Sequence, residues 1–88
     1  SFYPDKSVDI VFSDAVLMFM APDTIRETLA EMGRVARYGL IFNEYHLADA
    51  MGGQYEGGRW VYDIINICKE LYPNLNYTIS VNILRMGF

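Results

Sequence analysis

Glu44 and His46 are the residues whose types and position best fit acid–base chemistry. They flank Tyr45, and Asn43 separates them from the apolar segment 40–42. A carboxylate or an imidazole at the end of a buried strand can act as a general base, or can hold a substrate amine or hydroxyl. A lone histidine at a strand end is also commonly a hydrogen-bonded surface residue, so both interpretations stay open. The pair lacks a third ligand at a diagnostic spacing, and we expect no metal site.

A second polar cluster, Ser13, Asp14 and Ala15, follows the apolar run Ile10–Phe12. In open parallel sheets, ligands bind outside the carboxyl ends of the strands. The cluster is therefore a candidate ligand-contacting turn. The alternative is a simple turn that ends a strand, in which Asp14 caps the next helical turn.

Apolar and aromatic residues near these clusters suit either a pocket or the core. The segment 16–19, which ends at Phe19, could line a ligand pocket, although core packing explains it as well. Tyr55 lies within a glycine-rich stretch and could belong to a lid that excludes water, or to a plain connector. The single cysteine, Cys68, is expected to be a small buried apolar residue.

The first half of the chain predicts a strand, a helix and a second strand. A strand is expected over 8–13, and its core, Ile10–Phe12, is apolar without alternation, which is typical of a strand covered on both faces. A helix is expected to begin at Pro22, with Thr24 and Glu27 at the spacing of a capping box. We expect it to end near Tyr38, with Gly39 as a left-handed cap.

The second half predicts a strand over 39–45, a mobile glycine-rich loop over 46–58, a helix and a third strand. Trp60, Ile64, Ile67 and Leu71 share one face of that helix, and Pro73 is expected to stop it. The partly alternating segment 76–84 predicts the third strand.

The order strand, helix, strand, helix, strand predicts one α/β domain with three mostly parallel strands and two crossover helices. Right-handed crossovers between strands laid down in one direction place both helices on the same face. The other face then needs cover from outside these 88 residues. Ser1, in place of an initiating methionine, is also what we expect of a fragment.

Composition narrows the class of function. With 52% hydrophobic residues, the chain has more apolar side chains than a small core easily hides, which indicates a partner or a missing part of the domain. A net charge of −4 disfavours nucleic acid as a partner. No apolar run approaches a membrane span, and no secretory signal is present. We therefore expect no membrane association. The single cysteine rules out an internal disulfide, which fits a reducing, cytoplasmic location.

Three segments carry a resemblance to a known family. YPDKSVDIVFSDAVL (3–17) resembles the pattern LPFPDxSFDxVxSxxVL of class I S-adenosylmethionine-dependent methyltransferases. LAEMGRVARYGLI (29–41) resembles the Leu-x-x-Glu-x-x-Arg-Val helix of that family, which often ends in Pro-Gly-Gly where this chain has Arg-Tyr-Gly. WVYD (60–63) is similar to a Trp-x-x-Asp-Tyr helix start, which is a weaker match.

The resemblance implies a partial Rossmann-like methyltransferase fold, with residues 1–88 as the C-terminal part of the domain. The three strands would be the fourth to sixth of seven. The N-terminal cofactor-binding half, with its glycine-rich turn and ribose-binding acid, would be absent. The resemblance also assigns roles: S-adenosylmethionine would contact Ser13, Asp14, Ala15 and Val16, and the substrate pocket would hold Phe19, Tyr45 and Tyr55.

The leading hypothesis is thus a fragment of an enzyme that methylates a small molecule, itself binding the cofactor weakly or not at all. The alternative is a non-catalytic methyltransferase-like domain that pairs with another chain, and its exposed sheet edges would favour a homo-oligomer. A receiver-like domain is a third option, but Asp14 alone does not supply the acidic cluster that it needs.

Overall fold

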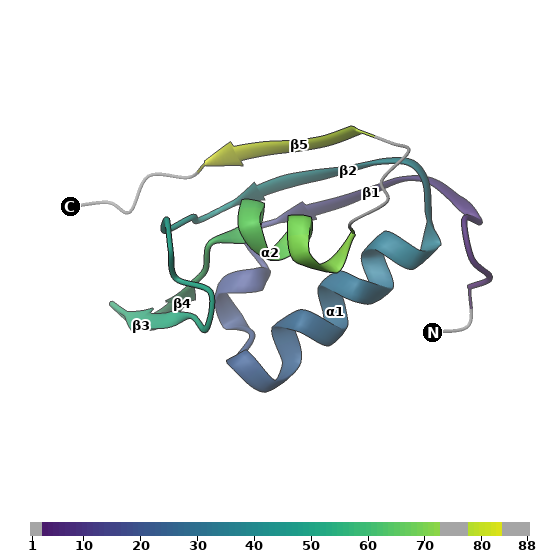
Figure 1. Cartoon of the computed structure of the whole chain (residues 1–88). Helices are drawn as coiled ribbons and strands as arrows, with labels where there is room; N and C mark the ends of the chain where they lie inside the picture. The colour runs from purple at the N-terminus through teal and green to yellow at the C-terminus, as the bar shows by residue number, and fades with distance from the viewer. Residues whose placement is uncertain (1–2, 73–77, 84–88) are drawn as a thin grey trace.

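A computed structural model describes residues 3–72 and 78–83 of the chain. It is an α/β fold in which two helices cover one face of a parallel sheet (Figure 1). The elements in chain order are β1 (Val8–Asp14), the short 3₁₀ turn η1 (Leu17–Phe19), α1 (Pro22–Val35), β2 (Ala36–Glu44), β3 (Gln54–Glu56), β4 (Arg59–Val61), α2 (Ile64–Leu71) and β5 (Thr78–Ile83).

The main sheet has the strand order β1-β2-β5, and both pairs of neighbours are parallel. Asp14 at the end of β1 pairs with Asn43, and Glu44 at the end of β2 pairs with Ile83. All three carboxyl ends therefore lie at one edge of the sheet, to which the arrowheads in Figure 1 point. The predicted three parallel strands, with both crossover helices on one face, are confirmed.

Helix α1 begins as expected, at Pro22, but without the capping box. Proline suits the first helical position because its missing N–H would have had no partner there. Ala21 is the N-cap, so Thr24 lies inside the first turn and its hydroxyl bonds to Asp23 instead. The capping-box prediction was therefore wrong, because the helix begins too early for Thr24 to lie before it.

The end of α1 also differs from the prediction. The helix ends at Val35, and Ala36 leaves it directly in an extended conformation (φ −73°, ψ 135°). Gly39 is not a left-handed cap, because it lies within β2 and pairs with Ile10. Ala36 is fully buried, so its side chain packs where the strand enters the sheet, and the strand starts three residues earlier than expected.

The expected mobile loop over 46–58 contains half of an antiparallel hairpin. Strand β3 pairs with β4, and Gly57 and Gly58 form the two-residue turn between them. Both glycines have positive φ angles, 59° and 83°, as the tight turns of two-residue hairpins require. The hairpin lies beyond the carboxyl ends of the parallel strands (Figure 1).

Helix α2 begins later than the sequence pattern indicated. Trp60 belongs to β4, and the helix starts at Ile64 with Asp63 as its N-cap. The Asp63 carboxylate accepts a hydrogen bond from the backbone N–H of Asn66. Trp60 lies in the strand before the helix cap, but it packs against the same core as the helix. Its spacing from Ile64 therefore matches the helical repeat without Trp60 being helical.

The third predicted strand is β5, for which the structure gives Thr78–Ile83. The outer residues of the predicted segment, 76, 77 and 84, and the expected stop at Pro73 lie outside the described residues. α2 ends at Leu71.

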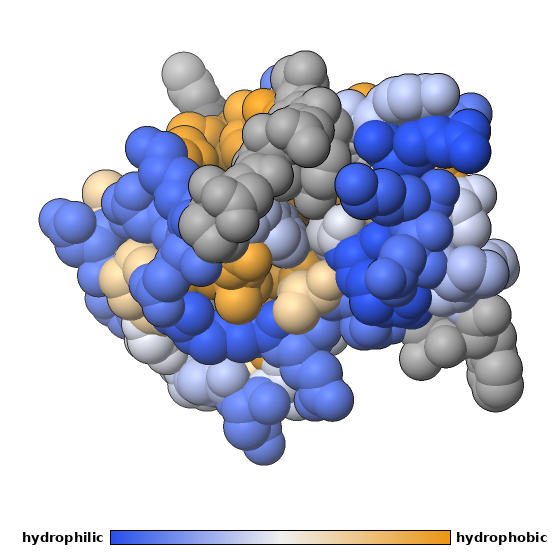
Figure 2. Space-filling view, turned by 45° about the vertical axis from the view of Figure 1, so that its right-hand side comes forward, coloured by the Kyte–Doolittle hydropathy of each residue, from blue (hydrophilic) through white to orange (hydrophobic). Residues whose placement is uncertain are grey.

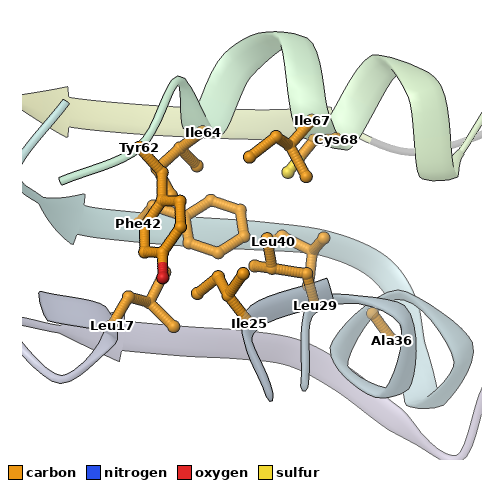
Figure 3. Close-up of a cluster of buried hydrophobic side chains, with 10 residues drawn as sticks. All are labelled: Leu17, Ile25, Leu29, Ala36, Leu40, Phe42, Tyr62, Ile64, Ile67 and Cys68. Carbon is orange, nitrogen blue, oxygen red and sulfur yellow. The ribbon is translucent and has the colours of Figure 1, made fainter. Parts of the chain in front are cut away.

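The core lies between the two helices and the sheet (Figure 3). From the sheet come Leu40 and Phe42, neither of which is exposed at all. Ala36, the first residue of β2, belongs to the core as well. The other members come from the two helices, η1 and the segment before α2: Leu17, Ile25, Leu29, Tyr62, Ile64, Ile67 and Cys68. Burial of these side chains is the main force that holds the helices on the sheet.

The opposite face of the sheet is bare within the described part of the chain. Ile10 is 47% exposed and Phe12 is 60% exposed, whereas Val11 between them packs against the core. Successive strand residues point to opposite faces, so Ile10 and Phe12 lie on the face without helices. Figure 2 shows that apolar residues also reach the surface between hydrophilic regions in the view that it presents.

Candidate functional site

The turn after β1 is the most constrained part of the carboxyl edge. Ala15 has a φ of 54°, in the left-handed region that residues other than glycine rarely adopt. Its N–H donates to the backbone carbonyl of Asn43, 3.0 Å away. The Asn43 side chain in turn donates to Asp14, at 2.9 Å. The turn is thereby joined to the neighbouring strand β2 by both backbone and side-chain bonds.

Glu44 braces the same turn from inside. Its carboxylate is 1% exposed and accepts hydrogen bonds from the Ser13 hydroxyl and from the backbone N–H groups of Val16 (3.3 Å) and Leu17 (3.2 Å). Buried acceptors that serve several donors fix local geometry, because losing them would leave each donor unpaired. This arrangement favours a positioning role for Glu44 over direct contact with a substrate.

The four residues that the family resemblance linked to the cofactor thus form one turn with a defined shape. Ser13 is buried, whereas Asp14 and Val16 are exposed at the carboxyl edge, Val16 by 48%. A ligand at this edge would meet the outer side of the turn. Asp14 does not cap η1, since Val16 is its N-cap and makes no side-chain cap bond.

The three residues expected in a substrate pocket line none of the three cavities described below. Phe19 in η1 is 72% exposed and Tyr55 in β3 is 61% exposed. Strand β4 packs against η1, which brings the hairpin beside the turn. Cavities of about 350, 360 and 300 Å³ lie elsewhere, between α1 and β1, between α2 and β5, and on the bare face of the sheet.

The hairpin carries a row of aromatic contacts. The Tyr55 ring meets Trp60 edge-on, with centroids 5.3 Å apart, and Trp60 stacks on Tyr62 at 6.3 Å. The Arg59 guanidinium lies 4.5 Å from the centroid of the Tyr45 ring. These contacts tie the hairpin to the segment after β2 and give it a defined position.

His46 lies next to the N-cap of α2. Its Nε2 is 3.7 Å from an oxygen of Asp63, and its side chain is 13% exposed. Its Nδ1 is buried and has no hydrogen-bond partner among the described residues. This placement separates His46 from Glu44, so the structure does not join the two predicted acid–base residues in one site.

Asp63 is the residue that sequence reasoning missed. Its buried carboxylate accepts hydrogen bonds from the backbone N–H groups of Asp49 (2.8 Å) and Asn66 (3.0 Å) and from the Asn66 side chain. Burial acts to raise the pKa of Asp63, but these bonds, with a contribution from His46, hold that pKa below its ordinary value. The helix-start spacing Asp-x-x-Asn was the available signal, and the helical periodicity of Trp60 obscured it.

Two further findings concern binding partners. In residues 3–72 and 78–83, no three His, Cys, Asp or Glu side chains lie together as a metal site would require. None of the helices found there is long and apolar enough to cross a membrane.

The chain matches no protein-family model, and no curated protein or solved structure is significantly similar to it. Its function must therefore be argued from the fold and from the turn at the carboxyl edge.

Proposed function

We propose that the chain is the C-terminal part of a class I methyltransferase domain, whose parent transfers a methyl group from S-adenosylmethionine to a small molecule. The observation that carries the proposal is the turn Ser13–Val16, which Glu44 braces at the carboxyl edge of a parallel sheet. Ligands of open α/β sheets bind at this edge. The sequence pattern of the turn resembles that family.

In this proposal the turn presents its exposed atoms, at Asp14 and Val16, to the methionine part of the cofactor. Glu44 does not touch the cofactor but keeps the turn in its strained shape. Methyl transfer forms a bond from the substrate nucleophile to the methyl carbon while the carbon–sulfur bond breaks, which leaves S-adenosylhomocysteine. Such a step depends chiefly on alignment of the two reactants, so a strong general base is not required.

Phe19, Tyr45 and Tyr55 then flank the substrate side of the site. His46 remains the candidate to take the proton that an oxygen or nitrogen nucleophile loses. Residues outside this chain would supply the glycine-rich turn and the ribose-binding acid, and would cover the bare sheet face on which Ile10 and Phe12 are exposed.

The experiment is a titration of the ¹⁵N-labelled chain with S-adenosylhomocysteine, followed by amide chemical shifts. We expect weak binding, with Kd on the order of 1 mM, because most of the cofactor site is missing. The shift changes should concentrate at residues 13–16. Saturable shifts elsewhere, or no shifts at millimolar ligand, would overturn the proposal.

A matched pair of variants sharpens the titration. Glu44→Gln should weaken the shifts at the turn, because the amide replaces one acceptor oxygen by a donor and disturbs the brace. Glu27→Gln makes the same chemical change at an exposed site on α1 and should leave the titration unaltered.

The second candidate function is a non-catalytic domain that pairs with another chain. The exposure of Ile10 and Phe12 on a sheet face without helices favours it. A folded chain that gives no shifts with the ligand but associates in solution would support this function instead.

A further inference from the structure

Segment 46–53, which we call the strap, joins β2 to the hairpin and lies against the start of α2. Two backbone hydrogen bonds fasten it there. The Leu47 N–H donates to the carbonyl of Tyr62, 3.0 Å away. The Asp63 N–H donates to the carbonyl of Ala50, also at 3.0 Å. Both bonds end on the two residues that precede α2, so these attachments are concentrated at one place.

A third bond comes from Asp49, whose N–H donates to the Asp63 carboxylate at 2.8 Å. The same carboxylate accepts bonds from the backbone N–H of Asn66 (3.0 Å) and from its side-chain amide (2.8 Å), both within α2. When Asp49 moves away, the carboxylate keeps these partners and turns its freed side to water. Release of the strap therefore leaves no buried charge without a partner and does not require α2 to unfold.

The strap also has hydrogen bonds of its own. The N–H of Ala50 donates to Leu47 (3.3 Å), that of Met51 to Asp49 (2.9 Å) and that of Gly53 to Ala50 (3.3 Å), each to a carbonyl oxygen. These bonds join residues two or three positions apart, so they do not depend on contact with α2. The strap is therefore able to move as one body.

The closed position carries two costs, both in the first half of the strap. Asp49 has a φ of 68°, in the left-handed region that a side chain disfavours. The Nδ1 atom of His46 is buried and has no hydrogen-bond partner in the described part of the chain, which also costs free energy. Opening relaxes the backbone at Asp49 and gives the His46 nitrogen a water partner.

Packing opposes these two costs. Met51 lies against the hydrophobic core. Gly53 lies so close to the ring of Tyr62 that a Cβ atom there would overlap it. The closed position is thus favoured by burial and disfavoured by strain and by an unpaired polar atom. Such a balance is typical of segments that open at a lower free energy than global unfolding.

We infer that the strap opens as one unit from the start of α2, and that this opening gates His46, whose side chain is 13% exposed when the strap is closed. The inference goes beyond the proposed function, because it uses the contacts between the strap and α2 and not the cofactor turn. Within that function, His46 would take a substrate proton only in the open state.

The first test is native-state hydrogen exchange of the ¹⁵N-labelled chain, followed by NMR. The amides of Leu47, Asp49 and Asp63 should report one common opening equilibrium, at least about tenfold larger than that of the amides of β2. Three unrelated openings, or exchange of these amides only together with β2, would overturn the inference.

A backbone substitution separates an opening strap from a merely fastened one. Asp49→Gly keeps the N–H that bonds to Asp63 but removes the strain, and should reduce the opening equilibrium about threefold, net of the freedom that glycine gains when the strap opens. Lys6→Gly is the matched control, because Lys6 also has a positive φ (53°) but lies far from the strap in the chain. It should leave the exchange of the strap unchanged. Faster exchange in Asp49→Gly would contradict the inference.

A second variant acts in the opposite direction. Gly53→Ala should increase the opening equilibrium about tenfold, because the new methyl group meets the Tyr62 ring and the φ of 84° disfavours a side chain. Gly52→Ala is its control, since nothing lies within 4 Å of the position of its Cβ. A Gly53→Ala chain that remains folded and exchanges like wild type would show that the strap does not rest on Tyr62.

His46 reports the gate directly, because it is the only histidine in the chain. At one fixed pH, its rate of modification by diethyl pyrocarbonate should rise in Gly53→Ala and fall in Asp49→Gly, in step with the exchange of the strap. Equal rates in all variants would show that the strap does not gate His46. These measurements use no cofactor, so the inference can fail while the titration with S-adenosylhomocysteine succeeds, and the reverse.

Discussion

The two faces of the parallel sheet carry similar apolar side chains but have different surroundings. On the face that the helices cover, Leu40 and Phe42 are completely buried. On the opposite face, Ile10 and Phe12 are 47% and 60% exposed. The difference arises because both crossovers place their helices on the same side of the sheet. The strands are apolar on both faces, so their sequence alone does not show which face of the sheet the helices cover.

The largest expected effect comes from truncating the same side chain on each face. Phe42→Ala should lower the free energy of unfolding by about 4 kcal/mol, because it leaves a cavity in the core. Phe12→Ala should change it by less than about 0.5 kcal/mol in the monomer, because the ring is already largely in water. Urea unfolding of dilute samples, followed by circular dichroism, measures both. Equal losses would show that the two faces do not differ in burial.

The next effect concerns Glu44, which lies on the covered side of the carboxyl edge. Glu44→Ala should cost about 3 kcal/mol, since the Ser13 hydroxyl and the backbone N–H groups of Val16 and Leu17 lose their acceptor. Glu27→Ala, at an exposed position on α1, should cost less than about 0.5 kcal/mol. The same urea experiment applies. A loss at Glu44 no larger than that at Glu27 would mean that the turn needs no brace.

A smaller effect is expected where the two helices touch each other on the covered face. A Cβ added at Gly33 would overlap the ring of Tyr72, whose hydroxyl donates to the Leu29 carbonyl. Gly33→Ala should therefore cost about 2 kcal/mol through overpacking. Gly52→Ala is the control, because nothing lies within 4 Å of the position of its Cβ. Thermal melts of both variants give the comparison, and a neutral Gly33→Ala would mean that the helices can separate without loss.

The smallest effect is a pH dependence at the start of α2, where Asp63 helps to hold that helix on the covered face. The pKa of Asp63 is lowered in the folded state, so its contribution to stability is complete above the unfolded pKa of about 3.9. That contribution is lost as the pH falls through the folded pKa. Asp63→Asn keeps an acceptor oxygen but does not titrate, and should cost about 1 kcal/mol at pH 7.

The difference between wild type and Asp63→Asn should shrink as the pH is lowered from 7 towards about 2. Urea midpoints measured across this range provide the test. A constant difference at every pH would show that ionisation of Asp63 does not contribute to stability.

Much of the fold could be predicted from local patterns. The apolar segments 10–12 and 40–42 gave two strands, and Pro22 gave a helix start at the correct residue. The alternation of strands and helices predicted the parallel sheet and the common side of both helices. These features follow from residues close in sequence and from the fixed hand of crossover connections.

The ends of helices and strands were predicted less well, because the same residue type can mark two different structures. Gly39 looked like a helix cap, but glycine also fits a buried strand position. Trp60 matched the helical spacing of Ile64, although it precedes the Asp63 cap and lies in a strand. The glycine pair Gly57 and Gly58 indicated a loop, and the positive φ angles that make it a hairpin turn appear only once the flanking strands pair.

The candidate site was predicted by position but not by role. Sequence reasoning placed Ser13 and Glu44 at strand ends, and the parallel sheet brings those ends together. It did not show that the Glu44 carboxylate would receive the Ser13 hydroxyl and two backbone N–H groups, or that His46 would lie beside Asp63 instead.

By itself, then, the sequence determined the order of the three parallel strands and the two helices between them, and that both helices lie on the same face of the sheet. Apolar patterns are local, and the hand of crossover connections is general, so neither needs the tertiary structure. Only the tertiary structure decided which carboxylate braces which turn and which apolar residues stay in water. Ser13 and Glu44 are 31 residues apart in the chain. Their contact exists only after β1 and β2 pair in one register, and that register depends on burial of the whole core.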